Sequence, residues 1–111
     1  MTENNENDIK LKDLSNYWWL FGGNGGKTRI RIINLLLNRP YNANQISKIL
    51  HTSYRNIIHH LKLLEKAKIV YTNNLKYGKL FIISPDFNHN LYSEVIHSSN
   101  SQLKSAISID S

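Results

Sequence analysis

Hydrophobic positions recur at helical spacing in three consecutive segments in the middle of the chain. They predict helices over residues 27–38, 43–50 and 53–67, because apolar residues three and four positions apart lie on one face of a helix. Pro40 ends the first helix, and Asn42 is of a residue type that caps the start of the second. The predicted inward positions are Ile30, Ile33 and Leu37 in the first helix, Ile46, Ile49 and Leu50 in the second, and Ile57, Leu61 and Leu64 in the third.

Strand-like segments follow these helices. Residues 69–73 and 79–83 are rich in β-branched and aromatic residues, and the polar segment 74–78 separates them, so the pattern predicts a β-hairpin. A further helix is expected on each side, over residues 9–21 and from residues 86–88 onward. The predicted fold class is therefore mainly α with a small β-hairpin (α+β), a winged helix-turn-helix with flanking N- and C-terminal helices.

These elements divide the chain into four parts. Residues 1–8 are polar and are expected to be disordered, and residues 9–26 form an N-terminal helix and a Gly-rich joint. The joint has four Gly among residues 22–26, which fits either a flexible link or a turn with positive φ. Residues 27–85 form the winged helix-turn-helix domain, and residues 86–111 carry the C-terminal helix.

Positive charge is concentrated in the central part. Between Lys27 and Pro85 there are eleven Lys or Arg and a single acid, Glu65, which gives a local balance of +10. The two flanks, residues 1–26 and 86–111, each carry −2, so the net charge of +6 understates how cationic the centre is. A phosphate-rich partner, double-stranded DNA, is the simplest reason for this distribution.

The third helix has the properties of a helix that enters a DNA major groove. About 15 residues at a rise of about 1.5 Å span roughly 22 Å, and the first turns are rich in polar side chains. Arg can bridge guanine and Asn can bridge adenine, each with two hydrogen bonds. The predicted base-reading residues are Ser53, Tyr54, Arg55, Asn56, His59 and His60, and the predicted DNA backbone contacts are Lys27, Thr28, Arg29, Arg31, Asn44, Lys48, Thr52, Lys62, Lys76, Tyr77 and Lys79.

The segment from His59 to Val70 resembles the end of the recognition helix and the first wing strand of ArsR-type winged-helix repressors. Ser53 falls where that family often has a helix-starting Ser. Residues 25–29 and 39–45 look more specifically like a group of archaeal winged-helix regulators. The resemblance covers about residues 22–85, and it implies a dimeric transcription regulator that reads a pseudo-palindromic site.

Two departures from the ArsR pattern change what the resemblance implies. Lys68 stands where Gly is common, and a left-handed helix end would be strained there, so a different helix end is expected. Residues 49–51 lack the thiolate pair of metal-sensing members, so metal sensing through that site is not carried over. The chain has no Cys, and adjacent His59 and His60 point about 100° apart on a helix, so no metal or other cofactor is expected.

The sequence supports neither nucleotide binding nor catalysis. The run Gly26-Lys27-Thr28 ends like a phosphate-binding P-loop, but the first Gly of that motif would fall on Phe21. The sequence shows no Ser/His/acid or paired-carboxylate arrangement, so no enzymatic activity is expected.

The flanking helices carry apolar stripes that fit either core packing within one chain or a dimer interface, and we favour the interface. Two recognition helices about 34 Å apart would then bind one face of the DNA. The predicted interface residues are Leu11, Leu14, Trp18, Trp19, Phe21, Leu91, Tyr92 and Val95.

The composition also bears on location and on competing functions. The acidic, polar N-terminus and the lack of an apolar run of membrane-spanning length predict a cytoplasmic, nucleoid-associated protein. Two alternatives to a sequence-specific regulator stay open. One is a non-specific, chromatin-like DNA-binding protein, and the other is a winged-helix module that binds a protein partner.

Overall fold

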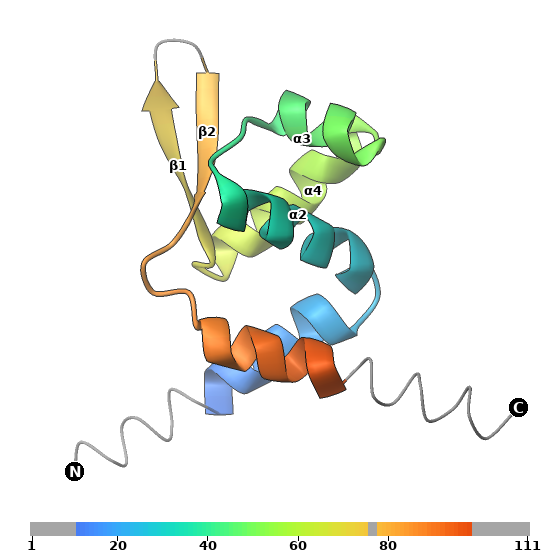
Figure 1. Cartoon of the computed structure of the whole chain (residues 1–111), viewed down its shortest axis with the longest axis vertical. Helices are drawn as coiled ribbons and strands as arrows, with labels where there is room; N and C mark the ends of the chain where they lie inside the picture. The colour runs from blue at the N-terminus through green and yellow to red at the C-terminus, as the bar shows by residue number, and fades with distance from the viewer. Residues whose placement is uncertain (1–10, 76–77, 99–111) are drawn as a thin grey trace, which may run out of the picture. The chain divides into compact units, whose positions relative to one another are not determined.

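The computed structural model describes residues 11–75 and 78–98 (Figure 1). The described chain has five helical segments and one two-stranded hairpin, which confirms the predicted fold class. It falls into two compact units. The described part of the flanking unit is residues 11–26 and 88–98, and that of the central unit is residues 27–75 and 78–87.

The central unit is a three-helix body with a β-hairpin wing. Its helices are α2 (Gly26–Asn38), α3 (Ala43–Leu50) and α4 (Tyr54–Lys66), and its strands are β1 (Val70–Leu75) and β2 (Gly78–Ile83). The strands are antiparallel, with Val70 opposite Ile83. Tyr41, just before α3, pairs with Phe81 of β2, whose N–H donates to the Tyr41 carbonyl at 2.9 Å. This bridge ties the wing to the helices.

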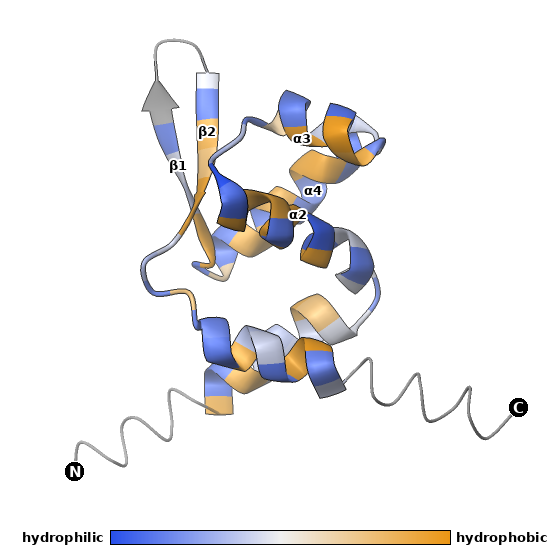
Figure 2. Ribbon diagram, in the orientation of Figure 1, coloured by the Kyte–Doolittle hydropathy of each residue, from blue (hydrophilic) through white to orange (hydrophobic). Residues whose placement is uncertain are grey.

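The core of the central unit agrees with one predicted helix stripe and corrects two others. Ile57, Leu61 and Leu64 of α4 are buried as predicted, but Leu37 of α2 and Ile49 of α3 are exposed. In α2 Ile33 is buried as predicted, and the other buried hydrophobic residues are Ile32 and Leu36. Five of the six residues 32–37 are apolar, so helical spacing alone does not select one stripe there. Figure 2 shows hydrophobic and hydrophilic bands alternating along α2, α3 and α4.

The starts of α3 and α4 are capped by the residues that the sequence suggested. Asn42 caps α3: its Oδ1 accepts from the Gln45 N–H at 2.8 Å, and the Gln45 side chain accepts from the Asn42 N–H at 2.9 Å. This reciprocal pair is a capping box. Ser53 caps α4, where its Oγ accepts from the Asn56 N–H at 3.2 Å. Both caps act within four residues of chain, so local sequence fixes where these helices begin.

The end of α4 contradicts the prediction for Lys68. Lys68 has a φ of 62°, so this Lys does adopt the left-handed conformation. Its N–H donates to the Glu65 carbonyl at 2.9 Å, and the Ile69 N–H donates to the Leu64 carbonyl at 3.0 Å, which are the two bonds of a Schellman motif. Leu64 and Ile69 are both buried. Burial of this apolar pair and the two hydrogen bonds together offset the strain at Lys68.

Replacing Lys68 by Gly should therefore stabilise the protein by about 0.5–1 kcal/mol, because Gly adopts positive φ without a Cβ clash. For a domain of this size the expected rise in Tm is about 2–8 °C. The matched control is Lys66→Gly, which removes the same charge inside the last helical turn and should cost about 1 kcal/mol. Thermal unfolding followed by circular dichroism measures both, and a fall in Tm for Lys68→Gly would contradict the strain at this position.

The flanking unit is built from two helical segments around an aromatic cluster. Residues 11–17 are α-helical and continue as the π-helical turn η1 (Trp18–Gly22), and residues 89–98 form the second helix. The ring of Phe21 packs edge-on against Tyr17 and Tyr92, with centroid distances of 5.6 and 4.9 Å. The Tyr17 hydroxyl accepts from the Asn88 N–H at 3.0 Å. Burial raises the pKa of both tyrosines, so both stay neutral.

The inward face of the first helical segment differs in part from the predicted stripe. Its buried residues lie at positions i, i+3 and i+4, the ordinary spacing of one helix face. Tyr17, Leu20 and Phe21 are buried, whereas Leu11 and Trp19 are exposed. The Gly-rich segment forms a turn in which Gly25 has a φ of 80°. The disorder predicted for residues 1–8 falls outside the described residues.

Candidate nucleic-acid interface

The first two turns of α4 present four polar side chains together. Arg55, Asn56 and His59 are exposed because the core residues of α4 hold its opposite face inside the unit. With Ser53 they line one open, shallow depression. Tyr54 is also exposed, but it belongs to a different flank of the helix and lines another cavity. The structure thus brings together Ser53, Arg55, Asn56 and His59, four of the six predicted base-reading residues.

The turn between α3 and α4 is held by hydrogen bonds to backbone carbonyls at the end of α3. The Thr52 N–H donates to the Ser47 carbonyl at 3.1 Å. The Leu50 carbonyl accepts from the Thr52 hydroxyl and from Arg31 Nη2, each at 3.1 Å. Thr52 and Arg31 therefore help to fix the angle at which α4 leaves the body. Arg31 is exposed, so its role as a backbone contact stays a prediction.

Two predicted DNA contacts are wrong, because Arg29 and His60 lie inside the protein and bind each other. Arg29 is 2 % exposed and His60 is 6 % exposed. Arg29 Nη1 lies 3.1 Å from His60 Nδ1. Neither side chain can reach a base or a phosphate from this position. The pair instead joins α2 to the recognition helix.

A sequence signal for this burial existed. Arg29 lies three, four and seven positions before Ile32, Ile33 and Leu36, which places it on the buried stripe of α2. His60 likewise lies three positions after Ile57 and four before Leu64, on the buried stripe of α4. The polar side chains of Arg29 and His60 suggest exposure, but the position of each residue on the inward face of its helix places it in the interior.

The protonation state of the buried pair follows from its surroundings. Burial lowers the pKa of His60, and the charge of Arg29 and the neighbouring His59 lower it further. Burial also lowers the pKa of Arg29, but a guanidinium is strongly basic and remains a donor. The neutral His60 ring therefore accepts the Arg29 hydrogen bond through Nδ1. Protonation of His60 would remove that acceptor and place two positive groups in contact.

The other predicted backbone contacts differ in exposure. Thr28 and Thr52 are half-buried. Lys76 and Tyr77 lie outside the described residues. The exposed members of the set are Lys27, Arg31, Asn44, Lys48, Lys62 and Lys79.

Within residues 11–75 and 78–98, no group of three or more His, Asp or Glu side chains is placed to hold a metal ion. No helix in the described part of the chain is long and apolar enough to span a membrane.

The described helices and hairpin have the winged helix-turn-helix arrangement, with the start of α4 exposed. Residues 26–72 match the family model described as bacterial regulatory protein, arsR family. The match covers the three helices of the central unit and the first residues of β1, and it supports an ArsR-like transcriptional regulator. This match to a regulatory-protein family agrees with the expectation from sequence that the chain is not an enzyme.

Solved structures show the same fold. Reduced HlyU from Vibrio cholerae superposes with a TM-score of 0.59 at 18 % identity, over 86 % of this chain and 90 % of that chain. The adhesin competence repressor AdcR from Streptococcus pyogenes gives 0.57 at 20 % identity, over 92 % and 79 %. A transcriptional regulator homologue from Pyrococcus horikoshii gives 0.52 at 24 % identity, over 90 % and 95 %. No curated protein matches the chain.

Proposed function

We propose that this protein is a sequence-specific, double-stranded DNA-binding transcriptional regulator that acts as a homodimer. In this proposal α4 enters the major groove, and the wing segment 74–79 contacts the flanking groove or the backbone. The observation that carries the proposal is the joint exposure of Ser53, Arg55, Asn56 and His59 at the start of a helix whose other face is locked in the core. The arsR family match supports the DNA-binding part.

The charges of the central unit support the same partner. Lys27, Lys48, Lys62 and Lys79 are exposed, and the segment from residue 27 to residue 85 has a balance of +10. Such cations contribute affinity for phosphates, and the base-facing side chains contribute sequence preference. A regulator of this kind works on chromosomal DNA, so the proposal includes a cytoplasmic, nucleoid-associated location. The resemblance to archaeal regulators stays a prediction.

Selection of binding sites from random duplexes tests this function. A homodimeric regulator should enrich an inverted repeat with half-site centres about one helical turn, 10–10.5 base pairs, or a multiple of it apart. The mass of the selected complex should correspond to two chains on one duplex. Binding without any enriched sequence would favour the chromatin-like alternative. No binding at low salt would leave the protein-interaction module.

The proposed dimer surface is smaller than the predicted one. Phe21, Tyr92 and Val95 are buried, so these three interface predictions are wrong. Their side chains lie inside the flanking unit of a single chain, where Phe21 packs edge-on against Tyr92. The residues that remain are the exposed Leu11 and Trp19 and the half-buried Leu14, Trp18 and Leu91.

Replacing Trp19 by Asp should weaken the dimer by about 30-fold or more, because an interface Trp commonly contributes at least about 2 kcal/mol. Trp19 is 60 % exposed, so the folded chain should tolerate the change. Ser15→Asp adds the same charge at another exposed position of the 11–17 helix and should leave the dimer intact. Sedimentation analysis over a range of concentrations measures both variants. A Trp19→Asp protein that dimerises like the Ser15→Asp protein would remove Trp19 from the interface.

A further inference from the structure

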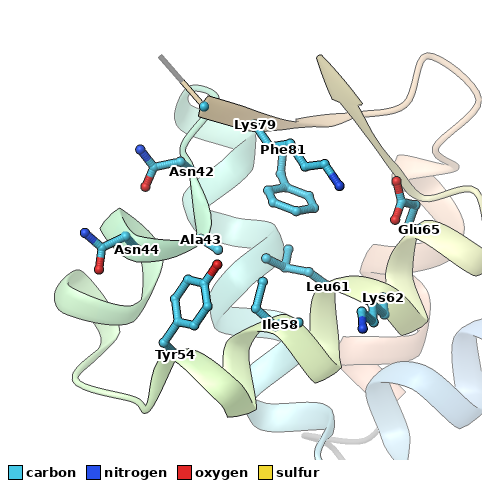
Figure 3. A pocket seen from close by; sticks show the side chains of 11 residues that line it. Asn42, Ala43, Asn44, Tyr54, Ile58, Leu61, Lys62, Glu65, Lys79 and Phe81 are labelled. Atoms are coloured by element: carbon cyan, nitrogen blue, oxygen red, sulfur yellow. The ribbon is translucent and has the colours of Figure 1, made fainter. Parts of the chain in front are cut away.

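A cavity of about 320 Å³ opens beside the recognition helix, within the central unit (Figure 3). Its walls come from the start of α3, one flank of α4 and strand β2. Its lining includes four apolar side chains, those of Ala43, Ile58, Leu61 and Phe81. Three of these are buried and Ile58 is half-buried, so the cavity has an apolar floor.

The rim of the cavity is polar and carries unequal charge. Lys62 and Lys79 contribute two positive charges, and Glu65 contributes one negative charge. In Figure 3 the Tyr54 ring stands at the opening with its hydroxyl directed toward the cavity. Tyr54, Lys62, Glu65 and Lys79 all line the cavity and are all exposed to solvent. The rim therefore has a net charge of +1 above an apolar floor.

The cavity lies on a different side of α4 from the base-facing residues. Successive helical residues are about 100° apart, so Tyr54, Ile58 and Glu65 share one flank, while Arg55 and His59 point outward. Lys62 lies at the border between these two sides. A ligand in the cavity can thus reach Lys62 without covering Arg55 or Asn56.

We infer that this cavity binds a small organic monoanion whose apolar body rests on the floor and whose acidic group is held by Lys62 and Lys79. The volume is at the lower end of the range of small-molecule sites, and an apolar floor with a few polar groups is their usual composition. Glu65 repels a second acidic group, so the site selects one negative charge. The bound anion competes with DNA phosphates for the same two lysines.

The consequence for DNA binding rests on the proposed function. If Lys62 and Lys79 each contact a phosphate, a bound anion removes two of these contacts per protomer. The slope of log K against log salt concentration should then become shallower by about 1.8 per protomer, at about 0.9 for each phosphate contact. The ligand acts as an inducer that releases the regulator from its site.

The cavity is tested first on the full chain without DNA, with 2-naphthoate as the probe and its neutral amide, 2-naphthamide, as the control. In ¹⁵N-resolved NMR titrations at millimolar probe, the largest shifts should map to residues of the cavity. Naphthoate should bind about fivefold more tightly than the amide, since two cations face its carboxylate. Equal binding of acid and amide, shifts elsewhere or no binding would each overturn the inference.

Variants refine this test. Lys62→Gln and Lys79→Gln should each weaken naphthoate binding about two- to fivefold, whereas Lys48→Gln, an exposed Lys outside the cavity, should not. Ala43→Leu should fill the cavity and abolish binding; if it does not fold, Ile58→Phe serves the same purpose. Unchanged binding by a folded, filled variant would overturn the assignment.

Measuring DNA binding against salt concentration, with and without naphthoate, separates the proposed DNA-binding function from the proposed anion site. Free protein that binds no DNA would overturn the proposed function, and the titrations without DNA would still decide the cavity. Naphthoate binding in the cavity with an unchanged salt slope would overturn the competition between anion and phosphate.

Discussion

Replacing Arg55 by Ala is expected to lower the affinity of the dimer for its selected site by about 30-fold to 10⁴-fold. A well-placed Arg that bridges guanine contributes about 1–3 kcal/mol of discrimination at each half-site, and a dimer carries two copies. Arg55 is exposed at the start of α4, beside Asn56 and His59. The proposed function therefore predicts that its guanidinium reaches base edges. Fluorescence anisotropy with the selected duplex at one fixed salt concentration measures this loss.

The control for this prediction separates sequence reading from charge. Lys48→Ala removes an exposed positive charge of α3 that is predicted to contact the DNA backbone, and it should weaken binding to all duplexes alike. Arg55→Ala should instead act mainly on the selected site and relax preference at one base pair. If Arg55→Ala weakens selected and random duplexes equally, Arg55 contacts only the backbone.

Replacing His60 by Leu is expected to lower the free energy of unfolding by about 1.5–3 kcal/mol. The Arg29 guanidinium is almost fully buried, and the substitution removes the ring nitrogen that accepts its hydrogen bond at 3.1 Å. Urea unfolding measures the loss. His59→Leu, at the exposed neighbour, should change stability by less than about 0.5 kcal/mol.

The double variant Arg29→Met/His60→Leu distinguishes a buried pair from simple loss of packing. With both partners apolar, no buried charge remains, so most of the lost stability should return. A double variant that is less stable than His60→Leu alone would show that Arg29 stabilises the fold independently of His60.

The same pair should make stability depend on pH. The pKa of His60 is lowered in the folded protein, so the unfolded chain takes up the proton first as the pH falls. The stability associated with neutral His60 is complete above about pH 6.5, and it is lost as the pH falls through the folded pKa. Urea unfolding between pH 7.5 and 5.5 should show a steeper acid loss for the wild type than for the double variant. Parallel curves would contradict this role of His60.

Most helix and strand boundaries could be predicted from sequence because they depend on neighbours in the chain. The caps Asn42 and Ser53 act within three residues, and the ends of the predicted strands differ from those of β1 and β2 by at most two residues. The candidate interface was predicted less completely. Ser53, Arg55, Asn56 and His59 are exposed, as base-reading residues would have to be, but Arg29 and His60 are buried although their residue types suggest exposure.

The flanking unit shows where helical spacing does not select one stripe. The predicted stripe ran through Leu11 and Trp18, but Tyr17 and Leu20 are buried, and together with Phe21 they fit helical spacing equally well. At Lys68 the prediction from residue type is wrong. A residue with a Cβ disfavours positive φ, but the contacts around Leu64 and Ile69 hold Lys68 in the left-handed conformation. In both cases packing decided the outcome.

The sequence by itself determined the order of three helices and a hairpin, the starts of α3 and α4, and the concentration of positive charge in residues 27–85. These properties depend on spacing, capping and composition within short stretches of chain. Only the tertiary structure decided that Arg29 and His60, 31 positions apart, form a buried pair, and that α3, α4 and β2 enclose a cavity. The physical reason is that burial and cavities arise where faces of distant segments meet, and local periodicity does not specify which faces those are.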